Sequence, residues 1–202
     1  MAEPAGRRPG GITMFRLLAT FLLLVPTVAL AHPGHGGGFA AGVMHPLLGL
    51  DHLLAMIGIG VWAARRETAA AGLVGLVFLA ALVAAFVIGT GTSPQAWAEF
   101  GILGSLLVVG LLLVLGQRLP LMPGLLLAGL FAVGHGHAHG TEMAPGLSAF
   151  TFGSGFVLAS ALLLVAGFVA GRWFSQLSPG RVLERAAGGV IVATAAYLLL
   201  MV

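Results

Sequence analysis

The chain has 202 residues, of which 59% are hydrophobic and only 7% are charged, far below the roughly 25% of charged residues in a soluble domain. This composition predicts an all-α membrane protein with several spans. All nine basic residues are arginines, so the chain has no Walker A lysine to hold a nucleotide, and no basic face for nucleic acid is indicated. The absence of cysteine excludes disulfides and thiolate metal sites.

The N-terminal residues 1–31 are typical of an export signal. Three arginines precede the apolar run LLATFLLLVPTVAL, and Ala29 and Ala31 place small residues at the −3 and −1 positions of a cleavage site. We expect cleavage after Ala31, which makes His32 the first residue of the mature protein. The alternative is an uncleaved first helix, against which Pro26 and the modest length of the run count.

Six apolar segments follow, each long enough to cross a bilayer, which requires roughly 20 residues. They cover residues 40–64, 69–89, 97–116, 120–139, 147–171 and 182–202. The arginines after the signal lie in or beside the connections that follow the first, third and fifth segments. The positive-inside rule places these connections in the cytoplasm. Residues 32–202 are therefore predicted to form a six-helix bundle with both mature ends on the outer side.

The first predicted span contains HPLLGLDH, with ionisable groups where a membrane makes them expensive. In a continuous helix, His45 and His52 share one face about 10.5 Å apart along the axis, and Asp51 points about 120° away from His45. Asp51 then meets a neighbouring helix or orients a ligand histidine through its far ring nitrogen. Pro46 weakens the helix, which is tolerated where the chain lines a polar cavity. The alternative is a set of structural hydrogen bonds between helices.

The fourth predicted span ends in GHGHAHGTE, residues 134–142. In a helix, His135 and His139 share a face, Glu142 follows one turn later, and His137 points to the other side. In an extended conformation all three histidines share one side, and the neighbouring glycines favour such unwinding. These side chains suit Ni²⁺, Co²⁺, Zn²⁺ or Cu²⁺. A histidine-rich loop without ligands is the alternative.

The two histidine motifs are expected at similar depth, because the first span runs inward and the fourth runs outward. They can then face each other across an outward-opening cavity and form one metal pathway. Its predicted members are His45, Asp51, His52, His135, His139 and Glu142, with His137 as the weakest assignment. At the mature N-terminus, His32 offers an amine and an imidazole, and with His35 it forms either a flexible metal-capture arm or a spacer.

These motifs together resemble the HupE/UreJ family over essentially the whole chain. His45 and Asp51-His52 match its H-x5-D-H motif, and the fourth span matches its H-G-x-A-H-G-x-E motif at His135, Gly136, Ala138, His139, Gly140 and Glu142. Gly134 stands where the family often has an aromatic residue. The resemblance implies a bacterial inner-membrane protein for uptake of nickel, or in some members cobalt, that serves hydrogenase, urease or cobalamin. The outer side is then the periplasm.

The sequence thus predicts a permease, not an enzyme, that moves a divalent metal ion from periplasm to cytoplasm. The resemblance favours Ni²⁺ and then Co²⁺, whereas ligand chemistry alone leaves Zn²⁺ and Cu²⁺ open. We expect no prosthetic group and no nucleotide or nucleic-acid partner; the metal ion and the lipid bilayer are the expected partners. A homo-oligomer and a link to metalloenzyme maturation are left open. The alternatives are a membrane metallohydrolase, in which a bound metal activates water, and an accessory protein that binds metal without transporting it.

Overall fold

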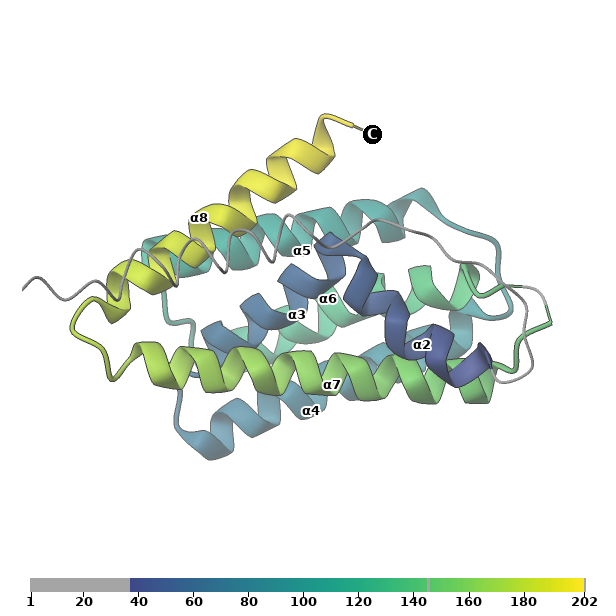
Figure 1. The fold of residues 1–202 in the computed structure, drawn as a ribbon, viewed down its shortest axis with the longest axis horizontal. Helices are drawn as coiled ribbons and strands as arrows, with labels where there is room; N and C mark the ends of the chain where they lie inside the picture. The colour runs from purple at the N-terminus through teal and green to yellow at the C-terminus, as the bar shows by residue number, and fades with distance from the viewer. Residues whose placement is uncertain (1–36, 145, 202) are drawn as a thin grey trace, which may run out of the picture. The chain divides into compact units, whose positions relative to one another are not determined.

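The computed structural model describes residues 37–144 and 146–201, and this part of the chain is all helical (Figure 1). The predicted signal peptide, its cleavage site and the arm with His32 and His35 lie outside the described residues. The helices are α2 (Gly37–Leu48), α3 (Leu50–Ala63), α4 (Thr68–Gly89), α5 (Ala96–Leu115), α6 (Leu121–Thr141), α7 (Ala149–Phe174) and α8 (Gly180–Leu199). Five of them are long and apolar enough to cross a membrane, and the bent pair α2–α3 makes up to six spans. The prediction of an all-α, multi-pass membrane protein is confirmed.

The first predicted span, residues 40–64, is not one helix. α2 and α3 are bent by 77° at a break centred on Gly49, whose backbone is extended at φ −78° and ψ 109°. Pro46 lies inside α2 and has no amide hydrogen to donate to the preceding turn, which weakens the helix just before the break. The predicted relation between His45 and His52, on one face of a continuous helix, is therefore wrong. The other five predicted spans each correspond to a single helix.

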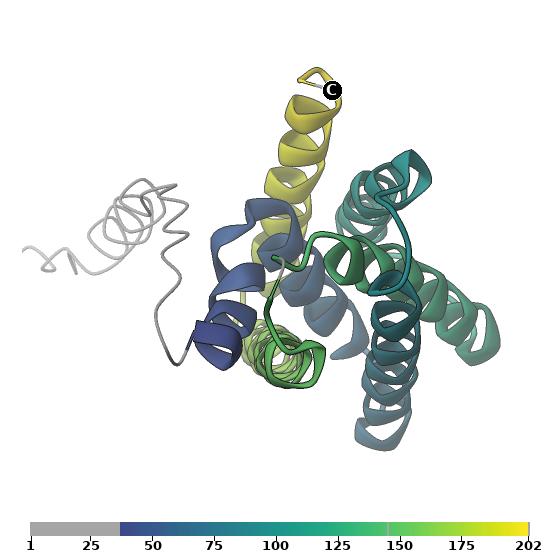
Figure 2. The same ribbon diagram turned by 90° about the vertical axis from the view of Figure 1, so that its right-hand side faces the viewer.

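Glycines bring the helices of the bundle into backbone contact. A Cβ atom at Gly136 of α6 would overlap the carbonyl oxygen of Leu82 in α4, and one at Gly42 of α2 would overlap that of Phe152 in α7. Small residues permit such close approach in lipid, where van der Waals packing holds helices together. Figure 2 shows the two pairs, with α2 alongside α7 and α6 alongside α4. This packing fixes the helices that carry both histidine motifs.

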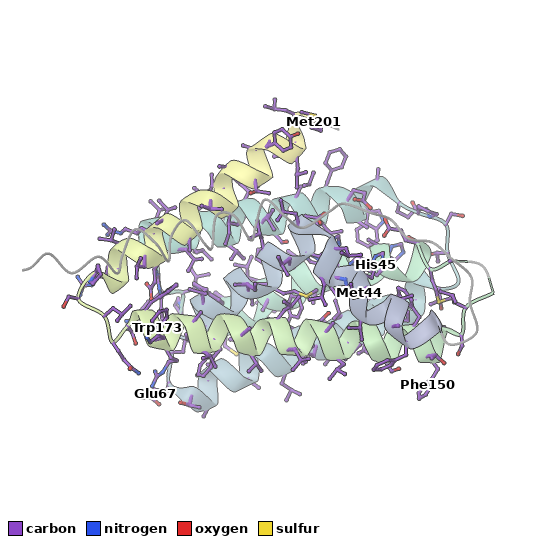
Figure 3. The ribbon with its side chains drawn as sticks, viewed as in Figure 1. Met44, His45, Glu67, Phe150, Trp173 and Met201 are labelled. Carbon is purple, nitrogen blue, oxygen red and sulfur yellow. The ribbon has the colours of Figure 1, made fainter. Side chains whose placement is uncertain are left out.

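The connections that carry arginines lie together at one end of the helices. Arg65 after α3 forms an ion pair with Glu184 of α8, with 2.8 Å between Nη2 and Oε2, and Arg66 donates to the backbone oxygen of Leu119 after α5. Figure 3 labels Glu67 and Trp173 at this end of the bundle and Phe150 at the other end. We call it the arginine end; the GHGHAHGTE motif lies at the opposite end of α6.

Candidate metal site

Two groups of potential metal ligands lie next to each other between α2, α3 and α6. The outer group is His45, His139 and Glu142, and the inner group is His52, His135 and His139; within each group the ligand atoms lie within 4.8 Å of one another. The side chains of His45 and Glu142 are 33% and 41% exposed, whereas His135 is fully buried. The two groups therefore lead from an accessible surface into the interior of the bundle.

His139 belongs to both groups and lies between the other histidines. Its ring centroid is 4.4 Å from that of His45 and 4.1 Å from that of His52. α6 remains helical through Thr141, so His135 and His139 share a face, and the extended conformation considered for this motif is not the one found. Both ring nitrogens of His139 are buried without a hydrogen-bond partner in the described part of the chain.

The bend at Gly49 brings His45 and His52 together by a route that differs from the predicted one. His45 lies near the end of α2 and His52 in the first turn of α3, and their ring centroids are 6.3 Å apart; His45 is labelled in Figure 3. A Cβ atom at position 49 would lie 2.7 Å from Nδ1 of His52. A glycine is needed here because any other residue would press on the histidine side chain.

Asp51 determines which nitrogen of His52 is free. Oδ1 of Asp51 lies 2.6 Å from Nδ1 of His52 and also accepts a hydrogen bond from the backbone amide of His52 at 2.9 Å. An ionised carboxylate can only accept, so Nδ1 carries the ring proton and donates it, which leaves the lone pair on Nε2. That Nε2 is buried and has no partner among the described residues. This is the carboxylate–histidine pairing that orients metal ligands in proteins.

Ser105 of α5 sets the tautomer of His135 in the same way. Its hydroxyl donates to the backbone oxygen of Ile102 at 2.7 Å, and its Oγ lies 3.0 Å from Nε2 of His135. Because the only hydroxyl hydrogen is already engaged, Oγ accepts from Nε2–H, and Nδ1 of His135 keeps its lone pair. Nδ1 is likewise buried without a partner in the described structure. Each inner-group histidine held by a polar neighbour thus presents one unprotonated nitrogen.

Glu142 lies at the C-terminal end of α6, where it faces two histidines of the outer group. Its Oε2 is 3.7 Å from Nδ1 of His139 and 3.6 Å from Nε2 of His45. Contacts with His139 and then His45 hold the pKa of Glu142 well below its usual range, so the carboxylate is ionised. Ligand atoms that each lie about 2.0–2.2 Å from one ion are separated by roughly 3–4 Å. Both distances from Glu142 to the histidines of the outer group fall in this range.

His137 lies away from both groups, on the opposite side of α6. Its Nε2 lies 3.1 Å from Oγ1 of Thr92, and its ring centroid is 4.6 Å from that of Trp97. The structure therefore brings six of the predicted ligands together, counting Asp51 through its bond to His52, and leaves His137 outside them.

Two nearby polar residues carry little signal in the sequence. Ser105 is an isolated serine in an apolar helix, and such residues commonly bond to their own helix. Glu99 lies in the first turn of α5, where a charged residue at a membrane interface is ordinary, yet its side chain lies close to that of Glu142. Only the packing of α5 against α6 reveals both.

Apolar side chains surround the two groups. The ring of Phe156 packs against His139 with centroids 4.6 Å apart, and that of Phe152 lies 5.7 Å from His45. One and two turns beyond His52, α3 presents Met56 and Ile59, both almost fully buried in the core. The candidate ligands thus end at the inner group, and mainly apolar buried side chains lie between them and the arginine end.

Comparison with known proteins gives two matches that span most of the chain. The family model described as "HupE / UreJ protein" matches residues 20–198. The curated protein named "Protein HupE" from Rhizobium leguminosarum bv. viciae is 33% identical over 179 residues, which are 88% of this chain and 93% of that protein. No solved structure matches the chain. Both histidine motifs fall inside the region that the family model covers.

Proposed function

Because this chain belongs to the HupE/UreJ family, we propose that it is a permease that carries a divalent transition-metal ion from the periplasm to the cytoplasm across a bacterial inner membrane. Ni²⁺ is the preferred ion and Co²⁺ the next, as the family resemblance implies. The observation that carries the proposal is the position of His139, which belongs to both the outer and the inner ligand groups. A purely structural histidine would have a fixed hydrogen-bond partner, whereas neither ring nitrogen of His139 has one in the described residues.

We propose that His139 transfers the ion from the outer group to the inner group. A neutral imidazole has a lone pair on only one of its two nitrogens at a time. His139 therefore completes one group or the other, and one ion occupies the pair of groups in turn. The ring centroids of His45 and His52 both lie within 4.4 Å of that of His139, so the ion exchanges ligands without leaving the cluster.

The order of exposure supports entry from the outer group. The partly exposed side chains of His45 and Glu142 meet the hydrated ion first, and the buried nitrogens of His52 and His135 replace the remaining water. Inward movement follows the membrane potential, because a divalent ion that crosses fully gains about 4.6 kcal/mol per 100 mV, twice the value for one charge. Since buried apolar side chains such as Met56 lie beyond the inner group, release to the cytoplasm requires a rearrangement of the helices.

We further propose that the mature protein has a periplasmic N-terminus and a periplasmic C-terminus, with the arginine end in the cytoplasm. The grouping of Arg65, Arg66 and Glu184 at one end of the bundle supports this orientation, since basic connections stay on the cytoplasmic side. His32 and His35 then lie outside the membrane, where they are proposed to capture metal before it reaches the outer group.

Uptake by the purified chain in proteoliposomes tests this function. Ni²⁺, Co²⁺, Zn²⁺ and Cu²⁺ are supplied separately outside vesicles with an inside-negative potential, and the accumulated metal is measured. We expect uptake of Ni²⁺ and less of Co²⁺, and we expect Asp51→Asn to lose most of it because the proton on Nδ1 of His52 is no longer held by a carboxylate. Metal binding without accumulation would identify an accessory protein instead, and accumulation of only Zn²⁺ or Cu²⁺ would overturn the choice of ion.

A further inference from the structure

The arginine end contains a cavity of about 850 Å³ between the ends of α3, α5 and α7 and the start of α8. Five arginines and one glutamate line it, which gives a formal charge of +4. The arginines are Arg65, Arg118, Arg172, Arg181 and Arg185, and the glutamate is Glu184. The cavity lies at the opposite end of the bundle from the two ligand groups and shares no residue with them.

The charges in this cavity divide into a structural pair and an unpaired set. Arg65 donates to Glu184 through Nε and Nη2 and to backbone oxygens at the end of α5, so this pair forms part of the wall. The side chains of the other four arginines make no hydrogen bond or salt bridge within residues 37–144 and 146–201. The positive-inside rule explains why arginines lie on this side of the membrane. It does not require them to surround one cavity, since each could lie anywhere along its connection.

We propose that this cavity binds the phosphate headgroup of an anionic phospholipid from the cytoplasmic leaflet. A guanidinium presents two parallel N–H groups that match the oxygens of a phosphate. Basic pockets between transmembrane helices on the cytoplasmic side are suited to such headgroups.

The rim of the cavity favours a lipid over a soluble phosphate. Leu115 and Val182 line the cavity and are 60% and 66% exposed, so they offer apolar surface next to the arginines. Trp173 is half exposed beside Arg172, and tryptophan is enriched at the level of the headgroups. A lipid uses both kinds of surface, with its phosphate among the arginines and its acyl chains along the apolar rim. Inorganic phosphate would use only the arginines.

Lipid binding to the full chain in detergent tests the proposal. Native mass spectrometry measures the retention of added phosphatidylglycerol, of cardiolipin and of zwitterionic phosphatidylethanolamine, and thermal unfolding is followed with each lipid and with inorganic phosphate. We expect the two anionic lipids to be retained and to raise the unfolding temperature. Arg181→Gln combined with Arg185→Gln should weaken binding by about 30-fold, because each arginine near an anionic lipid contributes about 1 kcal/mol and 1.4 kcal/mol is tenfold.

A charge-matched variant separates the cavity from the charge of the whole surface. Glu67 is exposed, lies at the same end of the bundle and does not line the cavity. Adding Glu67→Gln to the double variant restores one unit of net charge at this end without replacing a cavity arginine. If it restores lipid binding, the attraction is general and the cavity proposal is wrong.

The remaining outcomes also decide the proposal. Equal retention of phosphatidylethanolamine, or no loss in the double variant, would mean that the arginines serve only to orient the protein in the membrane. Equal protection by inorganic phosphate would overturn the lipid as the ligand. If the double variant does not fold, Arg118→Gln alone removes one exposed arginine from the connection after α5, and it should weaken binding by about fivefold on the same scale.

Discussion

Replacing Ser105 with alanine should weaken Ni²⁺ binding because it removes the group that fixes the tautomer of His135. In the native protein, Nε2–H of His135 donates to Oγ of Ser105 over 3.0 Å, and Nδ1 remains available to the ion. A bound ion polarises the ring, so the N–H of the metal-bound histidine needs its acceptor more than that of the free histidine does. Ser105→Ala should therefore destabilise the metal-bound state relative to the free state, by about 1–3 kcal/mol. At 1.4 kcal/mol per tenfold change, the affinity should fall by about 5- to 150-fold. This range includes the 10–100-fold typical of groups that orient metal ligands.

Ser160→Ala provides a matched control for this variant. Ser160 is also fully buried and its hydroxyl donates to a backbone oxygen of its own helix, that of Phe156, at 2.8 Å, but it makes no hydrogen bond to a histidine. Both variants should remain folded, and Ser105→Ala should lower the unfolding temperature more, because only this variant leaves a buried N–H without an acceptor. Calorimetric titration with Ni²⁺ should then show a large loss of affinity only for Ser105→Ala. Equal affinities in the two variants would refute the tautomer argument.

Three further predictions concern packing, the remaining histidine of α6 and the N-terminal arm. Gly136→Ala should destabilise the protein by about 1–3 kcal/mol in a denaturation experiment, because the added Cβ overlaps a backbone oxygen of α4. Gly129→Ala on the same helix is the control: its Cβ makes only an ordinary contact at 3.6 Å, so stability should be nearly unchanged. His137→Ala should reduce vesicle uptake less than alanine at either α6 histidine of the ligand groups; equal losses would place it on the pathway. Alanine at both His32 and His35 should lower uptake from dilute metal but not at saturation, and a loss at every concentration would contradict the capture role.

Most of the helical layout could be predicted from the sequence because hydrophobic length is the dominant signal in a membrane protein. The exception is residues 40–64, where the two helices on either side of the bend together are still apolar enough to read as one span. Pro46 and Gly49 carry the local information, but proline is tolerated inside membrane helices when neighbours satisfy the freed groups. The bend itself depends on α2 packing against α7 while α3 continues into the core. Such contacts between helices do not produce a hydrophobic periodicity from which the bend could be predicted.

The residues of the two ligand groups could be picked out from the sequence, but their positions relative to one another could not. Ionisable residues in an apolar span stand out, and this signal was enough to select His45, His52 and His139. Their mutual geometry depends on the angle at Gly49 and on the glycine contacts that hold α6 against α4, so it required the fold. The contact between Ser105 and His135 could not be predicted either. The two residues are 30 positions apart, and they meet only because α5 packs beside α6.

The charges of the proposed site match a divalent cation. Asp51 and Glu142 each contribute −1 when ionised, and the four imidazoles are neutral when they act as ligands. A bound divalent ion therefore leaves these six side chains with no net charge, provided that Glu99, which lies close to Glu142, is protonated. A monovalent ion would leave −1 and a trivalent ion +1, and an unbalanced charge is expensive among apolar neighbours such as Phe152 and Phe156. Mg²⁺ and Ca²⁺ have the right charge but prefer six or more oxygen ligands, whereas this cluster offers mainly nitrogen. The net charge therefore favours a divalent ion and the imidazoles favour the late first-row metals, so the same six side chains support both parts of the proposed choice of ion.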